Sequence, residues 1–186
     1  MNQDHTQNSS ITHYTPSPQM ADKLTANRQG HLTPTQRAPI IIAAIVTGVG
    51  LIGFTLFGMV ALWGFVQTLQ YSGFFGLGLI CLTGGSLSFL VIVFWVNANM
   101  FVPESFSQNP VKWERGRLKI KMASRERPEM PFSYIVGDYS FAPFVAPYEV
   151  PLEKGREYIV YYTARSRLLM SMAPVDQPES QEWLPH

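Results

Sequence analysis

Side chains that could take part in acid or base chemistry are few in this chain of 186 residues, and they are scattered. Histidine is the usual general base near neutral pH and a common metal ligand. All four histidines lie in polar segments near the two ends: His5, His13, His31 and His186. No HExxH, P-loop or GxSxG pattern occurs. We therefore expect neither a histidine-based catalytic centre nor a metal site.

Carboxylates are the remaining candidates for catalysis. After residue 110 the chain carries Glu129, Asp138, Glu149, Glu153 and Glu157, among others. Asp138, Glu153 and Glu157 belong to or flank expected turns, where solvated acidic side chains are common. This placement favours solvated acids over a catalytic pair. We expect a protein that is not an enzyme and has no cofactor, and a carboxylate-dependent membrane enzyme stays an alternative.

Charge is distributed very unevenly, although 14 Lys and Arg nearly balance 13 Asp and Glu. No Lys, Arg, Asp, Glu or His occurs between Arg37 and Glu104. That region holds two apolar stretches, residues 39–66 and 74–96, each long enough to cross the ~30 Å hydrocarbon core of a bilayer as a helix. Residues 67–73 are a short connection, which predicts an antiparallel transmembrane hairpin. We expect the lipid bilayer to be the first partner of this chain.

Small residues in the two apolar stretches are the candidates for helix packing, because they let helix backbones approach closely in lipid. They are Ala44, Gly48, Cys81, Gly84, Gly85 and Ser88. The simpler interpretation is that the two helices pack on each other. The alternative is self-association, or binding of a protein partner, through the transmembrane helices. Cys81 has no second cysteine to pair with, so it predicts a plain thiol within the membrane.

Cations flank the apolar region on both sides and are absent from residues 67–73. Lys23, Arg28 and Arg37 precede the first stretch, and Lys112, Arg115 and Arg117 follow the second. Because cytoplasmic segments are enriched in Lys and Arg, both termini are expected to be cytoplasmic. We expect a multi-pass protein of the inner or plasma membrane of a prokaryote.

The polar segments at the ends and in the middle predict little structure. Residues 1–38 are rich in Gln, Asn, Ser, Thr and Pro, and residues 173–186 are acidic and contain Pro. Such compositions bury too little apolar surface to offset ordering entropy, so we expect disordered tails. Residues 97–110 contain Pro103 and Pro110 and are expected to be a linker.

Residues 111–172 show short alternating runs that are typical of β-strands. In the clearest case, Gly137-Asp138 is a two-residue turn of the type with glycine first, so that Val136 faces Tyr139 and Tyr134 faces Phe141. About five strands in this length predict a small all-β domain of SH3 or OB size, as a curved sheet or a barrel. A helical hairpin followed by such a domain resembles NfeD-type membrane proteins in layout, and no residue role is carried over.

Seven cations against two acids make residues 112–127 strongly basic. The candidate contact residues for anionic lipid headgroups or a protein partner are Lys119, Lys121, Arg125 and Arg127. A solvated strand face is an equally good interpretation, and nucleic acid is not expected. The leading hypothesis is a non-catalytic accessory, scaffolding or assembly subunit. The alternative is a regulatory module that binds a ligand or anionic lipid through the basic strand.

Overall fold

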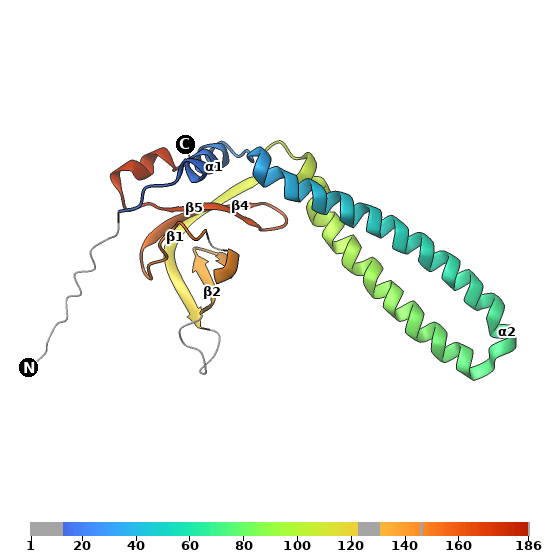
Figure 1. Ribbon diagram of the computed structural model, residues 1–186. Helices are drawn as coiled ribbons and strands as arrows, with labels where there is room; N and C mark the ends of the chain where they lie inside the picture. Colours follow the sequence, from blue (N-terminus) through green and yellow to red (C-terminus); the bar gives the residue numbers. More distant parts are fainter. Residues whose placement is uncertain (1–12, 123–130, 146, 186) are drawn as a thin grey trace, which may run out of the picture. The chain divides into compact units, whose positions relative to one another are not determined.

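The computed structural model describes residues 13–122, 131–145 and 147–185 (Figure 1). The chain divides into two compact units. The helical unit comprises Leu32–Pro110 together with Thr163–Arg167, and the sheet unit contains the segments before, between and after these two. Each unit is described by itself below.

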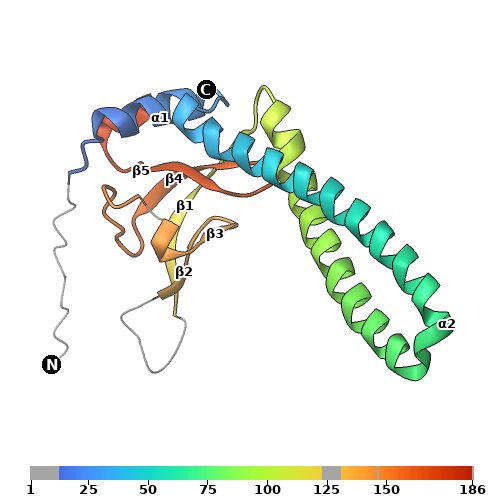
Figure 2. The ribbon, with the colours of Figure 1, turned by 45° about the vertical axis from the view of Figure 1, so that its right-hand side comes forward.

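Helix α2 (Pro34–Phe106) is a helical hairpin rather than one rod (Figure 2). It begins with a capping box, in which Thr33 and Gln36 satisfy each other's backbone amides. Gly73 has φ 58° and ψ −143°, a conformation that glycine adopts without strain, and the chain reverses there. The two apolar segments, Pro34–Gln67 and Gly76–Phe106, have the length and composition needed to cross a membrane.

The bounds of these helices differ from the sequence-based expectation. The first helix begins before residue 39, and the second continues beyond residue 96 to Phe106, so most of the expected linker at 97–110 is helical. Helix also continues through most of residues 67–73, which we expected to be a loop. The reason is that one glycine with positive φ suffices for the reversal, so a longer loop is not needed.

The two arms of α2 pack through aromatic rings near their middle. Phe54 and Phe94 stack with ring centroids 5.2 Å apart. Gly50 lies directly against Phe94, where a Cβ atom would overlap the ring. Hydroxyl groups in the arms donate to their own helix backbone, as in Thr47 to the Ala43 carbonyl at 2.7 Å. Polar side chains are thus satisfied locally, as an apolar environment requires.

The sheet unit contains a five-stranded sheet with the order β3-β2-β1-β4-β5. Its strands are β1 (Val111–Met122), β2 (Pro131–Val136), β3 (Tyr139–Phe141), β4 (Glu157–Thr163) and β5 (Leu169–Pro174). The pairs β1–β2, β2–β3 and β4–β5 are antiparallel. The expected small antiparallel β-sheet is therefore present. Among the described residues, β3 and β5 are the two edges of an open sheet, so the alternative of a closed barrel is not realised.

The β2–β3 hairpin has the predicted register and turn. Val136 pairs with Tyr139 and Tyr134 with Phe141. Gly137 has φ 58°, as the turn with glycine first requires. Gly116 on β1 lies so close to the Gly137 backbone that a Cβ atom on Gly116 would not fit.

Both expected tails contribute to the core of the sheet unit, which corrects the prediction of disorder for the described part of residues 1–38 and for most of residues 173–186. Helix α1 (Pro18–Arg28) is capped by Ser17 and packs on β5. A 3-10 helix, η2 (Pro178–Glu182), follows β5. A second 3-10 helix, η1 (Pro143–Val145), lies against β2. The tails supply these buried side chains to the core: Tyr14, Met20, Leu24, Val175 and Trp183.

The physical reason for this error is that average composition ignores where apolar side chains gather. Only a few apolar residues of each tail are buried, yet they join one cluster with β-strand residues such as Ile159 and Tyr161. Tyr14 and Trp183 meet edge to face with centroids 5.9 Å apart, which joins the two tails. Burial against a preformed sheet offsets an ordering entropy that neither tail could offset alone.

Candidate functional site

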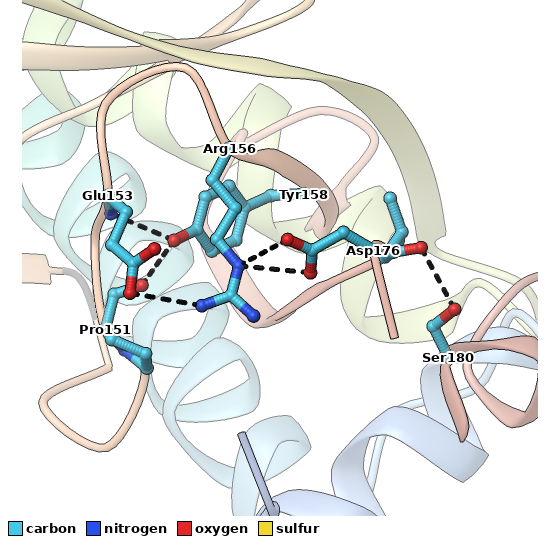
Figure 3. A network of polar contacts seen from close by, with 7 residues as sticks. Pro151, Glu153, Arg156, Tyr158, Asp176 and Ser180 are labelled. Atoms are coloured by element: carbon cyan, nitrogen blue, oxygen red, sulfur yellow. Dashed lines mark hydrogen bonds and ion pairs between the residues drawn. The ribbon is translucent and has the colours of Figure 1, made fainter. Parts of the chain in front are cut away.

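A buried arginine is the centre of the densest polar network in the described part of the sheet unit (Figure 3). The Arg156 side chain is only 3% exposed. Its Nε donates to both carboxylate oxygens of Asp176, at 2.9 and 3.1 Å, and its Nη1 donates to Glu153 at 3.3 Å. The guanidinium carbon lies 6.0 Å from the centre of the Tyr158 ring. Two acids, one on each side, therefore neutralise the buried cation of Arg156.

The same network reaches the N-terminal segment. The Gln177 side-chain oxygen accepts from Arg156 Nη2 at 3.2 Å and from the Tyr14 backbone amide at 2.6 Å. The Gln177 side-chain nitrogen donates to the Tyr14 carbonyl at 2.9 Å. Tyr158 contributes through its hydroxyl group, which donates to the Pro151 carbonyl and accepts from the Glu153 amide. Arg156 thus connects the start of β4 to both chain ends.

The pKa shifts of its members indicate that this network has a structural role and does not carry out acid–base chemistry. Burial lowers the pKa of Arg156, but the hydrogen bond and charge of Asp176, together with the charges of Tyr158 and Glu153, outweigh burial, and the net result is a raised pKa. A guanidinium that stays protonated cannot act as a general base. For the tyrosines, burial has the opposite effect. It raises the pKa of Tyr158, and it raises the pKa values of Tyr14 and Tyr161 to about 12. None of these tyrosines titrates near neutral pH.

A buried carboxylate occupies the end of α2 in the helical unit. Glu104 is buried and accepts hydrogen bonds from the backbone amides of Arg165 and Ser166, at 2.9 and 3.4 Å, and from the Ser166 hydroxyl. On the other arm, Arg37 Nη2 donates to the Ser105 carbonyl at 3.1 Å. Glu104 therefore holds the turn at Thr163–Arg167, which belongs to the same unit, through these three hydrogen bonds.

Two of the four basic residues predicted to make contacts lie in the described part of the chain. Lys119 and Lys121 lie on β1 with exposed side chains. Arg125 and Arg127 lie outside the described residues. Arg115, on the same strand, pairs with Glu157 at 2.9 Å, and this bond and charge raise the pKa of Arg115.

The small residues of the hairpin are mostly not in close helix contact. Ala44 is buried, and Cys81 is exposed. Gly48, Gly84 and Gly85 have no atom within 4 Å of the place where a Cβ would stand. Gly84 and Ser88 line an apolar groove of about 390 Å³ between the two arms, together with residues such as Gly58 and Phe65. The two arms approach each other closely at Gly50, which is not one of the six predicted packing residues.

One stretch of the apolar region has the spelling of a nucleotide-binding motif. Residues 48–53, with the sequence GVGLIG, match the GxGxxG spelling of a dinucleotide-binding loop. They lie inside α2, without the strand-to-helix turn through which that motif holds phosphate. The glycines here therefore belong to a helix surface. Among the described residues, no group of three His, Cys, Asp or Glu side chains is placed to hold a metal ion.

Sequence reasoning missed Arg156, Asp176 and Glu104. The two acids were set aside with the expected tail and linker. An arginine directly before the most apolar strand, after a glycine turn, was the one available signal, since a cation that begins a buried strand needs a partner.

Comparisons of the chain with protein-family models, with curated proteins and with solved structures found no match. The resemblance to NfeD-type proteins therefore stays one of layout.

Proposed function

We propose that this chain is a two-pass integral membrane protein that presents its sheet unit for interaction in the cytoplasm. Its role is that of a non-catalytic accessory, scaffolding or assembly subunit. The observation that carries the proposal is the exposure of apolar side chains along both arms of α2. Val49, Trp63 and Leu82 are each at least 66% exposed.

Burial separates this hairpin from the core helix of a soluble protein, which can be equally apolar. Only 11% of the most apolar window of the first arm is buried, and none of the corresponding window of the second. Continuous apolar patches of such size are not tolerated in water, whereas lipid tails match them. Lipid surrounding both arms is therefore the environment that suits the observed surface.

The orientation proposed is one with both chain ends on the cytoplasmic side. Residues 13–31 and the strands belong to one compact unit, which supports a common side for the segments before and after the hairpin. Cations that flank the apolar stretches in the sequence, such as Arg28, Arg37 and Lys112, favour the cytoplasm for that side. An inner or plasma membrane of a prokaryote fits this orientation.

Assembly is favoured by the groove between the arms. Small residues line it, and Gly58 and Gly84 have open space around them. Their backbones are thus free for close approach by another transmembrane helix, from a second copy or from a protein partner. The hairpin itself uses Gly50 for its close contact, so the groove is not needed for its own packing.

Adjacent glycines provide a matched test of this role. Gly84 lines the groove and Gly85 does not, while both have room for a side chain. Gly84→Leu should fill the groove and reduce association by at least about tenfold, since close packing is lost. Gly85→Leu should leave association near that of the unmodified chain. Cross-linking in the membrane, followed by purification in mild detergent, measures both variants against the unmodified protein.

A chain that is recovered alone, without a second copy or a stoichiometric partner, would contradict an assembly role. Equal loss of association in the two variants would also count against the groove, because it would indicate a general effect of added bulk. Circular dichroism of both variants should match the unmodified chain, which shows that the hairpin has formed.

A further inference from the structure

We infer that one face of β1 docks on the anionic headgroups of the membrane that holds the chain. This inference rests on the proposed function, because it takes the hairpin to be inserted in that membrane. The face consists of alternate residues of one strand, and it is called the basic face below. Its members are Trp113, Arg115, Arg117, Lys119 and Lys121.

Strand geometry puts these side chains together. Alternate residues of a strand point to the same side, and every member of the basic face is exposed. Leu118, on the other side, is buried in the core of the sheet unit. The cations therefore cannot turn inward, and the face has to meet water or a ligand.

The charge of the basic face is largely uncompensated. Arg115 is held by Glu157, but Arg117, Lys119 and Lys121 form no ion pair with any residue that the structure describes. On β2, the residues paired with Lys119 and Lys121 are Ile135 and Ser133, which carry no charge. Ser140 follows on β3, opposite Ile135. On the β2 and β3 side, these neighbours thus leave the charge of Lys119 and Lys121 uncompensated, and the basic face keeps a net positive charge.

Covalent connection keeps lipid within reach of this surface. Helix α2 ends at Phe106 and β1 begins at Val111. The few residues between them span at most about 3.6 Å each, so the sheet unit cannot leave the membrane surface. Such tethering gives a high effective concentration of headgroups and makes weak contacts sufficient. Trp113 is 51% exposed and is the member of the basic face that is closest in sequence to α2, and an indole there would suit the membrane interface.

A membrane fits this face better than a protein partner does. The centre of a protein interface is usually apolar and depleted in Lys. The basic face instead consists of four long cations and one aromatic residue at its end. Anionic lipid attracts each cation enough to change a docking equilibrium roughly fivefold.

The experiment uses the full chain in lipid nanodiscs. Cys81→Ser removes the native thiol, and Ser140→Cys carries an environment-sensitive dye on β3, which is separated from the strand of Lys119 by β2 alone. A second preparation carries the dye at Thr25→Cys, an exposed position of α1. Discs of phosphatidylcholine are compared with discs that also contain phosphatidylserine. Quenching by brominated lipid reports contact of the dye with the membrane.

Two matched double variants test which charges act. Lys119→Gln with Lys121→Gln removes two charges from the basic face. Lys23→Gln with Lys154→Gln removes two charges elsewhere in the sheet unit. Circular dichroism should be unchanged in both variants, since all four side chains lie outside the core.

The expected result is quenching at position 140 in anionic discs and little in neutral discs, with much less at position 25. Raised salt should reverse the quenching in anionic discs. The basic-face variant should lower the docked-to-free ratio of the sheet unit by at least about tenfold. The control variant should leave this ratio unchanged. Equal quenching in both kinds of disc, no quenching, or equal loss in both variants would overturn the inference. A chain that does not remain with the discs at all would instead contradict the proposed membrane insertion.

Discussion

At the scale of single residues, Arg156 and Asp176 are the pair on which the sheet unit most depends. The Arg156 side chain is 3% exposed and that of Asp176 is 24% exposed. Loss of the acid leaves a buried cation with weaker compensation, whereas loss of the arginine leaves an acid that water can reach. Replacement of Asp176 should therefore destabilise the sheet unit more than replacement of Arg156.

Asp176→Ala should lower the free energy of unfolding by about 1.5–3 kcal/mol, because the buried Arg156 loses both of its hydrogen bonds to this acid and keeps Glu153 as its one acidic partner among the described residues. Arg156→Met, which keeps most of the side-chain volume, should cost less. Glu179→Ala is the control, since that acid is exposed in the same segment. Denaturant unfolding of the purified chain, followed by tryptophan fluorescence, compares the three. An Asp176→Ala variant as stable as Glu179→Ala would refute the role of the pair.

Gly137 allows a second prediction at this scale. Its φ of 58° strains any residue with a side chain, so Gly137→Val should destabilise the sheet unit by about 1–2 kcal/mol. Asp138→Ala at the next turn position, where φ is not positive, should change stability little. The same unfolding measurement distinguishes them, and equal effects would remove the assigned turn.

The turn at Gly137 and the ion pair of Arg156 also show what the sequence could predict. The turn at Gly137 follows from neighbouring residues, and its register is confirmed. The ion pair joins Arg156 to an acid 20 positions away, in a segment whose composition indicated disorder. Pairing between distant segments leaves no local pattern, so sequence reasoning had no means to find it.

At the scale of elements, strands were predictable and α1 was not. The turn residues Gly137 and Asp138 are a local signal, and they placed the β2–β3 hairpin in the correct register. Helix α1 has 11 residues, fewer than the ~12–15 that an isolated helix needs for stability in water. It exists because Met20 and Leu24 join the core and because Asn27 donates to Ser171 at 2.6 Å.

Replacing Leu24 tests whether α1 is an integral part of the sheet unit. Leu24 is fully buried, and Leu24→Ala should cost about 2–5 kcal/mol through lost burial and a cavity. Thr25→Ala, at the exposed neighbour, should be close to neutral. Hydrogen exchange should show loss of protection in α1 and β5 for the first variant alone. Unchanged protection in both would mean that α1 does not stabilise the sheet.

At the scale of the whole molecule, the sequence indicated the two kinds of unit but assigned the chain ends to neither. The charge-free region identified the apolar hairpin, because that signal extends over many residues. The membership of residues 13–31 in the sheet unit needed the structure. A fragment cut at residues 105 and 175 would therefore lack part of the core, and tests of folding should use the full chain.

In the proposed topology the hairpin crosses a membrane and the sheet unit lies in the cytoplasm. Single-cysteine labelling in intact bacterial cells tests it most directly, with Cys81→Ala as background and cysteines placed at Ser72, near the reversal at Gly73, or at the exposed Ser140 on β3. An impermeant thiol reagent should label position 72 in intact cells, and position 140 only after the cells are permeabilised. Labelling of position 140 but not 72 in intact cells would reverse the orientation, and equal labelling of both would contradict a membrane-spanning hairpin.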